Sequence, residues 1–207
     1  MFINNLNLFP ILVQKYKIEP SQEEYQVFDT YLNALFNRAT EDAWALETGK
    51  STGEYNLFLH ERPESQWLMP KVFECVYHYW SALHYRTGAK IECTSAWANS
   101  HKFGQVTGEH SHCGGAVRAH ISAAYYFKKP ALSGNIEFVD PLEYIHKMTP
   151  IHEYSEYTPV GISHMYTEVD ASQFELVLFP SWLKHRTQTS QTNDERVCVS
   201  MNFIGHY

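Results

Sequence analysis

Residues 195–204, ERVCVSMNFI, alternate between two kinds of side chain. Such alternation is typical of a β-strand, because successive side chains of a strand point to opposite faces of its sheet. Val197, Val199 and Met201 share a hydrophobic face, while Arg196 begins a row of polar or small side chains on the other. The stretch therefore predicts a core strand whose second face carries a cation.

The position of Arg196 in this strand can be interpreted in two ways from the sequence. A charged side chain on the inward face of a core strand is costly unless it is paired. A carboxylate ligand held by two parallel hydrogen bonds would offset that cost. Alternatively, the face of Arg196 is the outer one, and its guanidinium forms a surface ion pair with Asp194 or Glu195.

A period of two also runs through most of residues 89–207. Short strands separated by Gly, Pro, Asn and Ser are typical of a β-sandwich or barrel. Residues 141–159 contain three prolines, and we expect a long loop there. The expected strands are residues 90–98, 103–111, 119–128, 134–139, 160–168, 174–180, 184–190 and 195–204.

The front of the chain has helical spacing instead. Residues 6–18 predict one strand, and Ser21 with Glu24 three positions later forms a capping box that begins a helix. A second helix is predicted over residues 64–87. We therefore expect a mainly β fold with flanking helices. Residues 1–88 would supply an N-terminal strand and buttressing helices, and residues 89–207 the core, as one compact unit.

Composition limits the classes of protein. The 44% hydrophobic and 19% charged residues are ordinary for a globular protein. The net charge of −7 argues against nucleic acid as a partner. No stretch approaches the about 20 apolar residues of a membrane span, and no signal peptide is recognisable. Four separated cysteines without a CxxC motif favour a reduced, cytoplasmic protein. A homodimer is the default expectation for a soluble oligomer.

His110 and His112 are the strongest local indication of a metal site. In a strand, residues i and i+2 point to the same face, so both imidazoles can reach one ion. A third ligand must come from elsewhere, and His185 is the best candidate because it begins a strand after an apolar one. The alternative is that His110 and His112 are two exposed strand residues, since the chain has 12 histidines.

Residues 89–205 resemble the double-stranded β-helix of the Fe(II)/2-oxoglutarate-dependent oxygenases, a jelly-roll or cupin-like core. In that family a His-x-acid pair and a distal His bind iron, and a basic residue roughly ten positions later binds the co-substrate. Here His110-Ser111-His112, His185 and Arg196 follow that order. Three further segments are similar to family strands, namely AAYYF at 123–127, SGNIEF at 133–138 and LVLFP at 176–180.

The resemblance implies an enzyme with Fe(II) and 2-oxoglutarate as cofactors. It would consume O2, release succinate and CO2, and oxidise an unidentified substrate, with hydroxylation as the expected outcome. His110, His112 and His185 would hold the iron, and Arg196 the far carboxylate of 2-oxoglutarate. The pattern looks most similar to a poorly characterised subgroup from marine bacteria and phages, which would place a phage-encoded protein in the host cytoplasm.

Further co-substrate contacts follow from the same resemblance. Tyr125 or Tyr126 would donate a hydrogen bond to the far carboxylate. Only one can face inward, and we favour Tyr126 because it lies an even number of residues from the small Ala124. Ser200 shares the face of Arg196. Asn99 is expected either to line the co-substrate pocket or to have a structural role.

His112 departs from the family pattern, which has Asp or Glu at this position. His112 can be interpreted in two ways. In the first, it ligates the metal and completes a three-histidine site. In the second, it lies behind the ligands, or the ligand position is left to water or an anion. We favour ligation, because the i, i+2 spacing suits it. Glu109 is a poor substitute, since adjacent strand residues point to opposite faces.

Two other classes of function are open. A cupin-type metal-binding protein, or a three-histidine metalloenzyme that does not use 2-oxoglutarate, fits the spacing from Gly104 to His110 and from Pro180 to His185. It lacks the expected glutamate after the His-x-His motif and leaves Arg196 without a role. A non-enzymatic jelly-roll structural protein would bind no metal.

Overall fold

The computed structural model describes residues 10–38, 49–53, 62–114, 117–142, 144, 148 and 165–207. These residues form two larger antiparallel sheets, a two-stranded one and the α-helices α1 (Gln22–Arg38) and α3 (Met69–Ala82). The main sheet consists, in order across it, of β1 (Gln14–Lys17), β9 (Glu175–Pro180), β6 (Ile121–Lys128), β11 (Arg196–His206), β3 (Lys90–His101) and β2 (Lys50–Ser51). The smaller sheet consists of β10 (His185–Thr187), β7 (Ile136–Val139) and β8 (Tyr166–Val169). A separate pair joins β4 (Cys113–Gly114) to β5 (Val117–Arg118).

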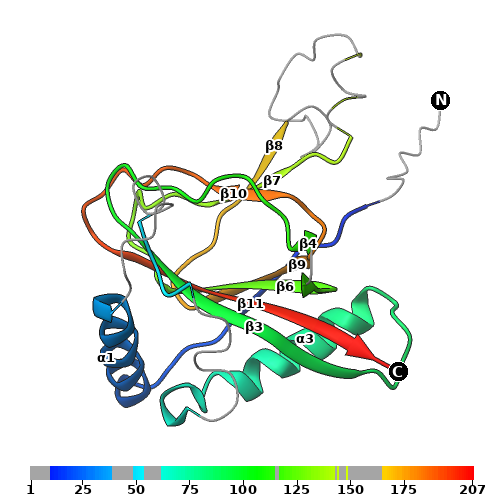
Figure 1. Ribbon diagram of the computed structural model, residues 1–207, viewed down its shortest axis with the longest axis horizontal. Helices are drawn as coiled ribbons and strands as arrows, with labels where there is room; N and C mark the ends of the chain where they lie inside the picture. Colours follow the sequence, from blue (N-terminus) through cyan, green and yellow to red (C-terminus); the bar gives the residue numbers. More distant parts are fainter. Residues whose placement is uncertain are drawn as a thin grey trace, which may run out of the picture.

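The chain moves between the two sheets as it proceeds. After β6 in the main sheet it forms β7 and β8 in the smaller one, and it then returns to β9, crosses to β10 and ends in β11. The helices α1 (Gln22–Arg38) and α3 (Met69–Ala82) lie on one side of the main sheet, and the smaller sheet lies on the other (Figure 1). This arrangement confirms the mainly β fold with flanking helices and a double-stranded β-helix core.

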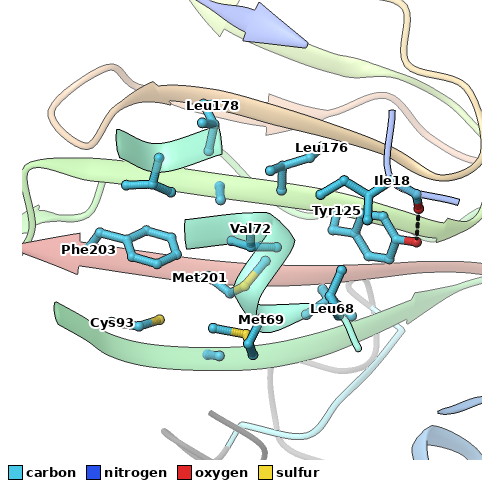
Figure 2. Packing of buried hydrophobic residues seen from close by; sticks show 14 of the residues in the cluster. Ile18, Leu68, Met69, Val72, Cys93, Tyr125, Leu176, Leu178, Met201 and Phe203 are labelled. Atoms are coloured by element: carbon cyan, nitrogen blue, oxygen red, sulfur yellow. Dashed lines mark hydrogen bonds between the residues drawn. The ribbon is translucent and has the colours of Figure 1, made fainter. Parts of the chain in front are cut away.

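The alternation of β11 divides the molecule into two environments. Its hydrophobic face packs with α1 and α3 in a core that includes Val197, Val199 and Met201. Figure 2 shows Val72 of α3 lying near Met201 in this core. Most of the hydrophobic stabilisation is expected here, at about 1.5–3 kcal/mol for each fully buried large side chain.

The opposite face of β11 is directed between the two sheets. Cys198 lies opposite Asn99 of β3 and Tyr126 of β6 in the sheet register, and Arg196 lies opposite His101. A second, smaller hydrophobic cluster fills part of this space. Its buried members are Ala124, Tyr126, Ile136, Phe138, Ala171, Val177, Phe179 and Leu183.

The helix predictions differ in accuracy between the two helices. The capping box is confirmed, since the Ser21 N–H donates to Glu24 Oε2 at 2.6 Å and the Glu24 N–H donates to Ser21 Oγ at 3.3 Å. The second helix is shorter than the predicted 64–87. Pro70 lacks an N–H and is tolerated only in the first turn, so α3 begins at Met69 after a short 3-10 turn, η1 (Pro63–Ser65). It ends at Ala82, before His84 adopts a positive φ of 54°.

The predicted strand over residues 103–111 is wrong. Gly104 has a φ of 78°, and its N–H donates to the Ser190 carbonyl instead of to a ladder partner. Only His110 forms an isolated bridge, to His185. The strand predicted at 184–190 is limited to His185–Thr187. Residues 6–9, 160–164 and most of the predicted loop at 141–159 lie outside the described residues.

Both short strands from the front of the chain join the main sheet. β1 pairs with β9 at one edge, and β2 pairs with β3 at the other. The division between residues 1–88 and 89–207 stays a prediction. None of the helices in the described part of the chain is long and apolar enough to cross a membrane.

Tyr125 ties the main sheet to the N-terminal segment. Its hydroxyl donates to the Ile18 carbonyl at 2.8 Å inside the core (Figure 2). We expect Tyr125→Phe to lower the free energy of unfolding by about 1–3 kcal/mol, because a buried carbonyl loses its donor. Urea unfolding measures this change. Tyr85→Phe is the control, since no hydrogen bond of the Tyr85 hydroxyl occurs among the described residues. Equal stability of both variants would contradict the prediction.

Candidate metal centre

Three histidines from two separate segments meet between the sheets. One nitrogen from each of His110, His112 and His185 lies within 4.8 Å of the corresponding atoms of the other two. The main chains of His110 and His185 exchange two hydrogen bonds, of 3.0 and 2.9 Å. The His112 N–H donates to the Ser181 carbonyl at 2.9 Å, in the turn that leads from β9 to β10. Backbone pairing therefore brings the three side chains together.

Two of the imidazoles have a defined tautomer. The His110 Nδ1–H donates to the Gly108 carbonyl at 2.9 Å, and the His185 Nδ1–H donates to the Leu183 carbonyl at 2.9 Å. A carbonyl oxygen only accepts, so the proton must be on Nδ1. The Nε2 lone pair of both rings is then free to bind a metal, as is usual when the other ring nitrogen is hydrogen-bonded.

The imidazole ring of His112 is held by side chains, whereas those of His110 and His185 are held by main-chain carbonyls. Its Nδ1 lies 2.6 Å from Asn202 Oδ1 and 2.9 Å from Ser122 Oγ. Its Nε2 is buried and has no hydrogen-bond partner in the described part of the protein. A buried polar atom without a partner is costly and indicates a missing ligand such as an ion. The three residues therefore fit a metal ion.

Burial keeps two of these rings uncharged. Desolvation lowers the pKa of His112 to about 4 and that of His185 to about 3. Both imidazoles are neutral near neutral pH, which is the form that binds a metal. Three nitrogen donors suit first-row transition metals better than Ca²⁺ or Mg²⁺, which prefer oxygen.

No carboxylate of the described residues belongs to this cluster. Glu109, the nearest acidic residue in sequence, has its carboxylate 3.4 Å from Lys184 Nζ and 3.4 Å from the Tyr166 hydroxyl. These contacts direct it away from the histidines, as its odd spacing from His110 predicts.

Arg196 and the three histidines line one cavity of about 270 Å³. Within the described chain this cavity has Arg196 as its only permanently charged lining residue and no acidic one. Such a lining favours an anionic ligand. The other polar or aromatic lining residues include Trp97, Asn99, His101, Thr107, Tyr126, Cys198 and Ser200.

The guanidinium of Arg196 is buried and has no acidic partner among the described residues. Its Nη1 donates to the Ser133 and Gly134 carbonyls at 2.8 and 2.9 Å, and its Nη2 donates to His101 Nδ1. Desolvation lowers its pKa, but an arginine stays charged. Nε–H and one Nη2–H are left to bind a ligand.

The alternative of a surface ion pair for Arg196 is therefore wrong. Its side chain is 1% exposed, and Glu195 turns the other way. The Glu195 carboxylate accepts from the Ser100 hydroxyl at 2.6 Å and lies 3.9 Å from Lys128 Nζ.

The two tyrosines lie on opposite sides of the main sheet. Tyr126 lines the cavity, whereas Tyr125 is in the core against the helices and donates to Ile18. The interpretation of Tyr125 as a ligand contact is thus corrected by the period of two in β6. Asn99 and Ser200 both line the cavity and are half-buried.

His101 and Asn202 were not recognised from the sequence as part of the site. His101 contacts Arg196, and Asn202 contacts His112. The alternation of side chains does place both residues on the cavity side of their strands, because His101 follows Asn99 by two positions and Asn202 shares the face of Arg196. It does not specify contacts, which depend on the pairing of β11 with β3.

The sequence matches a family model whose description is "Putative 2OG-Fe(II) oxygenase" over residues 95–202. These 108 positions are more than half of the 207 residues and contain all three histidines and Arg196. A comparison with curated protein sequences gives no significant match.

Several solved structures are similar in fold. A Pseudomonas putida prolyl-4-hydroxylase has a TM-score of 0.61 at 11% identity, over 94% of this chain and 93% of that one. The viral collagen prolyl hydroxylase of Paramecium Bursaria Chlorella virus-1 has a TM-score of 0.55 at 13% identity, over 98% of both chains. A Burkholderia pseudomallei 2OG-Fe(II) oxygenase family protein has a TM-score of 0.53 at 11% identity, over 92% and 83%. At these identities the similarity concerns the fold.

Removal of one histidine should weaken metal binding strongly. We expect His185→Ala to lower Co²⁺ affinity on the order of 100-fold or more, since it removes a ligand, and loss of a residue behind a ligand already costs 10–100-fold. Titration with Co²⁺, followed by its absorption spectrum, measures this change. His206→Ala is the matched control, because His206 lies at the end of β11 beside Glu92. Unchanged Co²⁺ binding by His185→Ala would contradict the assignment.

Proposed function

The chain belongs to the 2OG-Fe(II) oxygenase family, and from this membership we propose that His110, His112 and His185 hold Fe(II) while Arg196 anchors 2-oxoglutarate. The protein is an Fe(II)- and 2-oxoglutarate-dependent oxygenase. Bound iron supplies the redox chemistry that couples decarboxylation of 2-oxoglutarate, to succinate and CO2, to oxidation of a substrate by O2. The observation that carries the proposal is a buried arginine without an acidic partner in the described chain, in the same cavity as the histidines.

The proposed metal site uses three neutral donors. The backbone carbonyls of Gly108 and Leu183 orient His110 and His185, and the unpartnered Nε2 of His112 supports the third position. No acidic side chain of the described cluster balances the charge of the ion. The dianion 2-oxoglutarate would supply that negative charge, so the metal and Arg196 both favour its binding.

Arg196 would bind the far carboxylate of 2-oxoglutarate through its free N–H groups. Such charge-assisted hydrogen bonds are stronger than neutral ones. Tyr126 lines the same cavity as Arg196, and its hydroxyl would donate to the same carboxylate. Ser200 and Asn99 would line the remaining wall of this pocket.

Hydroxylation is the outcome that we propose for the substrate, which is not identified. The relation to a marine bacterial and phage subgroup stays a prediction. A location in a cytoplasm, of the host for a phage protein, a homodimeric state and the lack of a nucleic-acid partner stay predictions. The cupin alternative is less well supported, because it assigns no function to the buried Arg196.

Anaerobic binding of Fe(II) followed by 2-oxoglutarate tests the proposed function. The chelated 2-oxo acid has a weak visible charge-transfer band, and we expect this band in the wild-type protein. Arg196→Ala should raise the 2-oxoglutarate Kd at least roughly 25-fold, because loss of a buried charge contact costs about 2–5 kcal/mol. Its Fe(II) affinity should stay near that of the wild type.

Three variants make this titration specific. Arg86→Ala is the matched control, since Arg86 lies over the Tyr207 ring and does not line the cavity. Arg196→Lys keeps the charge but not the planar donor fork, so an intermediate Kd is expected. His112→Ala should lose Fe(II) affinity. A band of wild-type strength in Arg196→Ala would refute the assignment of Arg196, and no band in the wild type would refute use of 2-oxoglutarate.

Tyr126→Phe should separate the two tyrosines by function. We expect a 2-oxoglutarate Kd roughly 10- to 150-fold higher, since one hydrogen bond to a charged group contributes about 1.5–3 kcal/mol. Tyr125→Phe should bind 2-oxoglutarate as the wild type does, because its ring lies in the other core. The same band titration measures both variants. A reversed order of the two would contradict the placement of the tyrosines.

A further inference from the structure

A buried group of polar side chains lies behind His112. Asn202 of β11 is 3% exposed, and its Oδ1 accepts from the His112 Nδ1–H at 2.6 Å. Its Nδ2 donates to Ser95 Oγ of β3 at 2.9 Å. Ser122 Oγ of β6 lies 2.9 Å from His112 Nδ1, 2.8 Å from Asn202 Oδ1 and 2.9 Å from Ser181 Oγ. Two side chains from adjacent strands thus converge on one ring nitrogen, and each of them contacts a further serine.

The backbone of β11 has an irregularity at this position. Its register with β3 shifts between Asn202 and Phe203. Such bulges re-aim side chains and are frequent next to active sites. The shift here coincides with the residue that contacts His112.

Asn202 and Ser122 differ in which tautomer of the His112 imidazole each can contact. A hydroxyl both donates and accepts, so Ser122 is compatible with either tautomer of the imidazole. An amide oxygen only accepts, and the structure places the Asn202 oxygen toward His112 while Nδ2 donates to Ser95 Oγ. The Asn202 oxygen therefore requires a proton on Nδ1. The lone pair of His112 is then on Nε2, the atom without a partner in the described structure.

The other two histidines need no such residue. Main-chain carbonyls of Gly108 and Leu183 hold their Nδ1–H groups, and no side-chain substitution removes a carbonyl. A carboxylate ligand would also need none, because it has no tautomers. His112 is thus the one ring of the three whose tautomer depends on a side chain.

We propose that Asn202 is a positioning residue that fixes the tautomer and the orientation of His112, so that a neutral imidazole serves as the third metal ligand. The proposal rests on the proposed function, which assigns His112 to the metal. A histidine can serve as the ligand at this position only if a group that solely accepts hydrogen bonds lies behind its Nδ1, and Asn202 supplies that group. The residue acts through His112 and contacts neither metal nor co-substrate.

Co²⁺ binding by two Asn202 variants tests the role. Asn202→Leu has a similar size but no acceptor, and we expect its Co²⁺ affinity to fall 10–100-fold with an altered Co²⁺ absorption spectrum. Asn202→Asp keeps an acceptor, and its affinity should stay within a few-fold of the wild type or exceed it. An Asp variant as weak as the Leu variant would overturn the proposal, because packing and not acceptance would then be the cause.

Matched controls isolate the effect. Asn135→Leu makes the same change at a residue that contacts Glu168 outside the cluster, and its Co²⁺ affinity should not change. Ser122→Ala should cost less than Asn202→Leu, since it leaves the amide acceptor in place. A larger loss in Ser122→Ala would assign the role to Ser122 and overturn the proposal.

A measurement on the metal-free wild-type protein needs no variant to fold. Nitrogen NMR of the imidazoles near neutral pH should show the proton of His112 on Nδ1, and a proton on Nε2 would overturn the proposal. His112→Ala separates the two levels of inference. If it binds Co²⁺ as tightly as the wild type, the ligand assignment of the proposed function fails. If it loses affinity and Asn202→Leu does not, only the positioning role fails.

Discussion

Strand β11 is hydrogen-bonded to β3 on one side and to β6 on the other, and the rest of the molecule is arranged around its two faces. Its successive side chains alternate between the two faces, so neighbouring residues enter two different interiors. On one face Val197, Val199 and Met201 complete the core against the helices. On the other face, Arg196 lines the cavity, and Asn202 contacts His112 from behind. The hydrophobic core thus supports the face on which the chemistry depends.

The proposed metal site combines neutral ligands with a positively charged cavity wall. Burial keeps His112 and His185 neutral, and no carboxylate of the described cluster joins them. The buried guanidinium of Arg196 lines the same cavity. A site that is neutral at its ligands and cationic at its wall favours a dianionic ligand over a neutral one. A histidine in place of a carboxylate would leave the proposed metal site one negative charge short, and it would make the ring tautomer a new requirement.

Local rules predicted much of the fold because they act within a few residues. The capping box of Ser21 and Glu24 forms as predicted, and the period of two correctly separates Val199 from Cys198. The same rule separated Tyr125 from Tyr126 and favoured Tyr126 for the cavity, where the structure places it. Local rules were wrong where another constraint decided the backbone. Pro70 makes α3 begin at Met69, later than predicted. The Gly104 N–H donates to the Ser190 carbonyl, and no strand forms over residues 103–109.

Motif order and side-chain alternation are local properties of the chain, so the family, the class of fold and the candidate residues His110, His112, His185 and Arg196 could be inferred without the structure. The burial of Arg196 beside His101, the exposure of Tyr126 to the cavity and the position of Asn202 behind His112 became known only from the folded chain. The contact of Arg196 with His101 joins residues 95 positions apart, and that of Asn202 with His112 joins residues 90 apart. The register of β11 with β3 and β6 brings such distant residues together, and spacing along the chain does not specify that register.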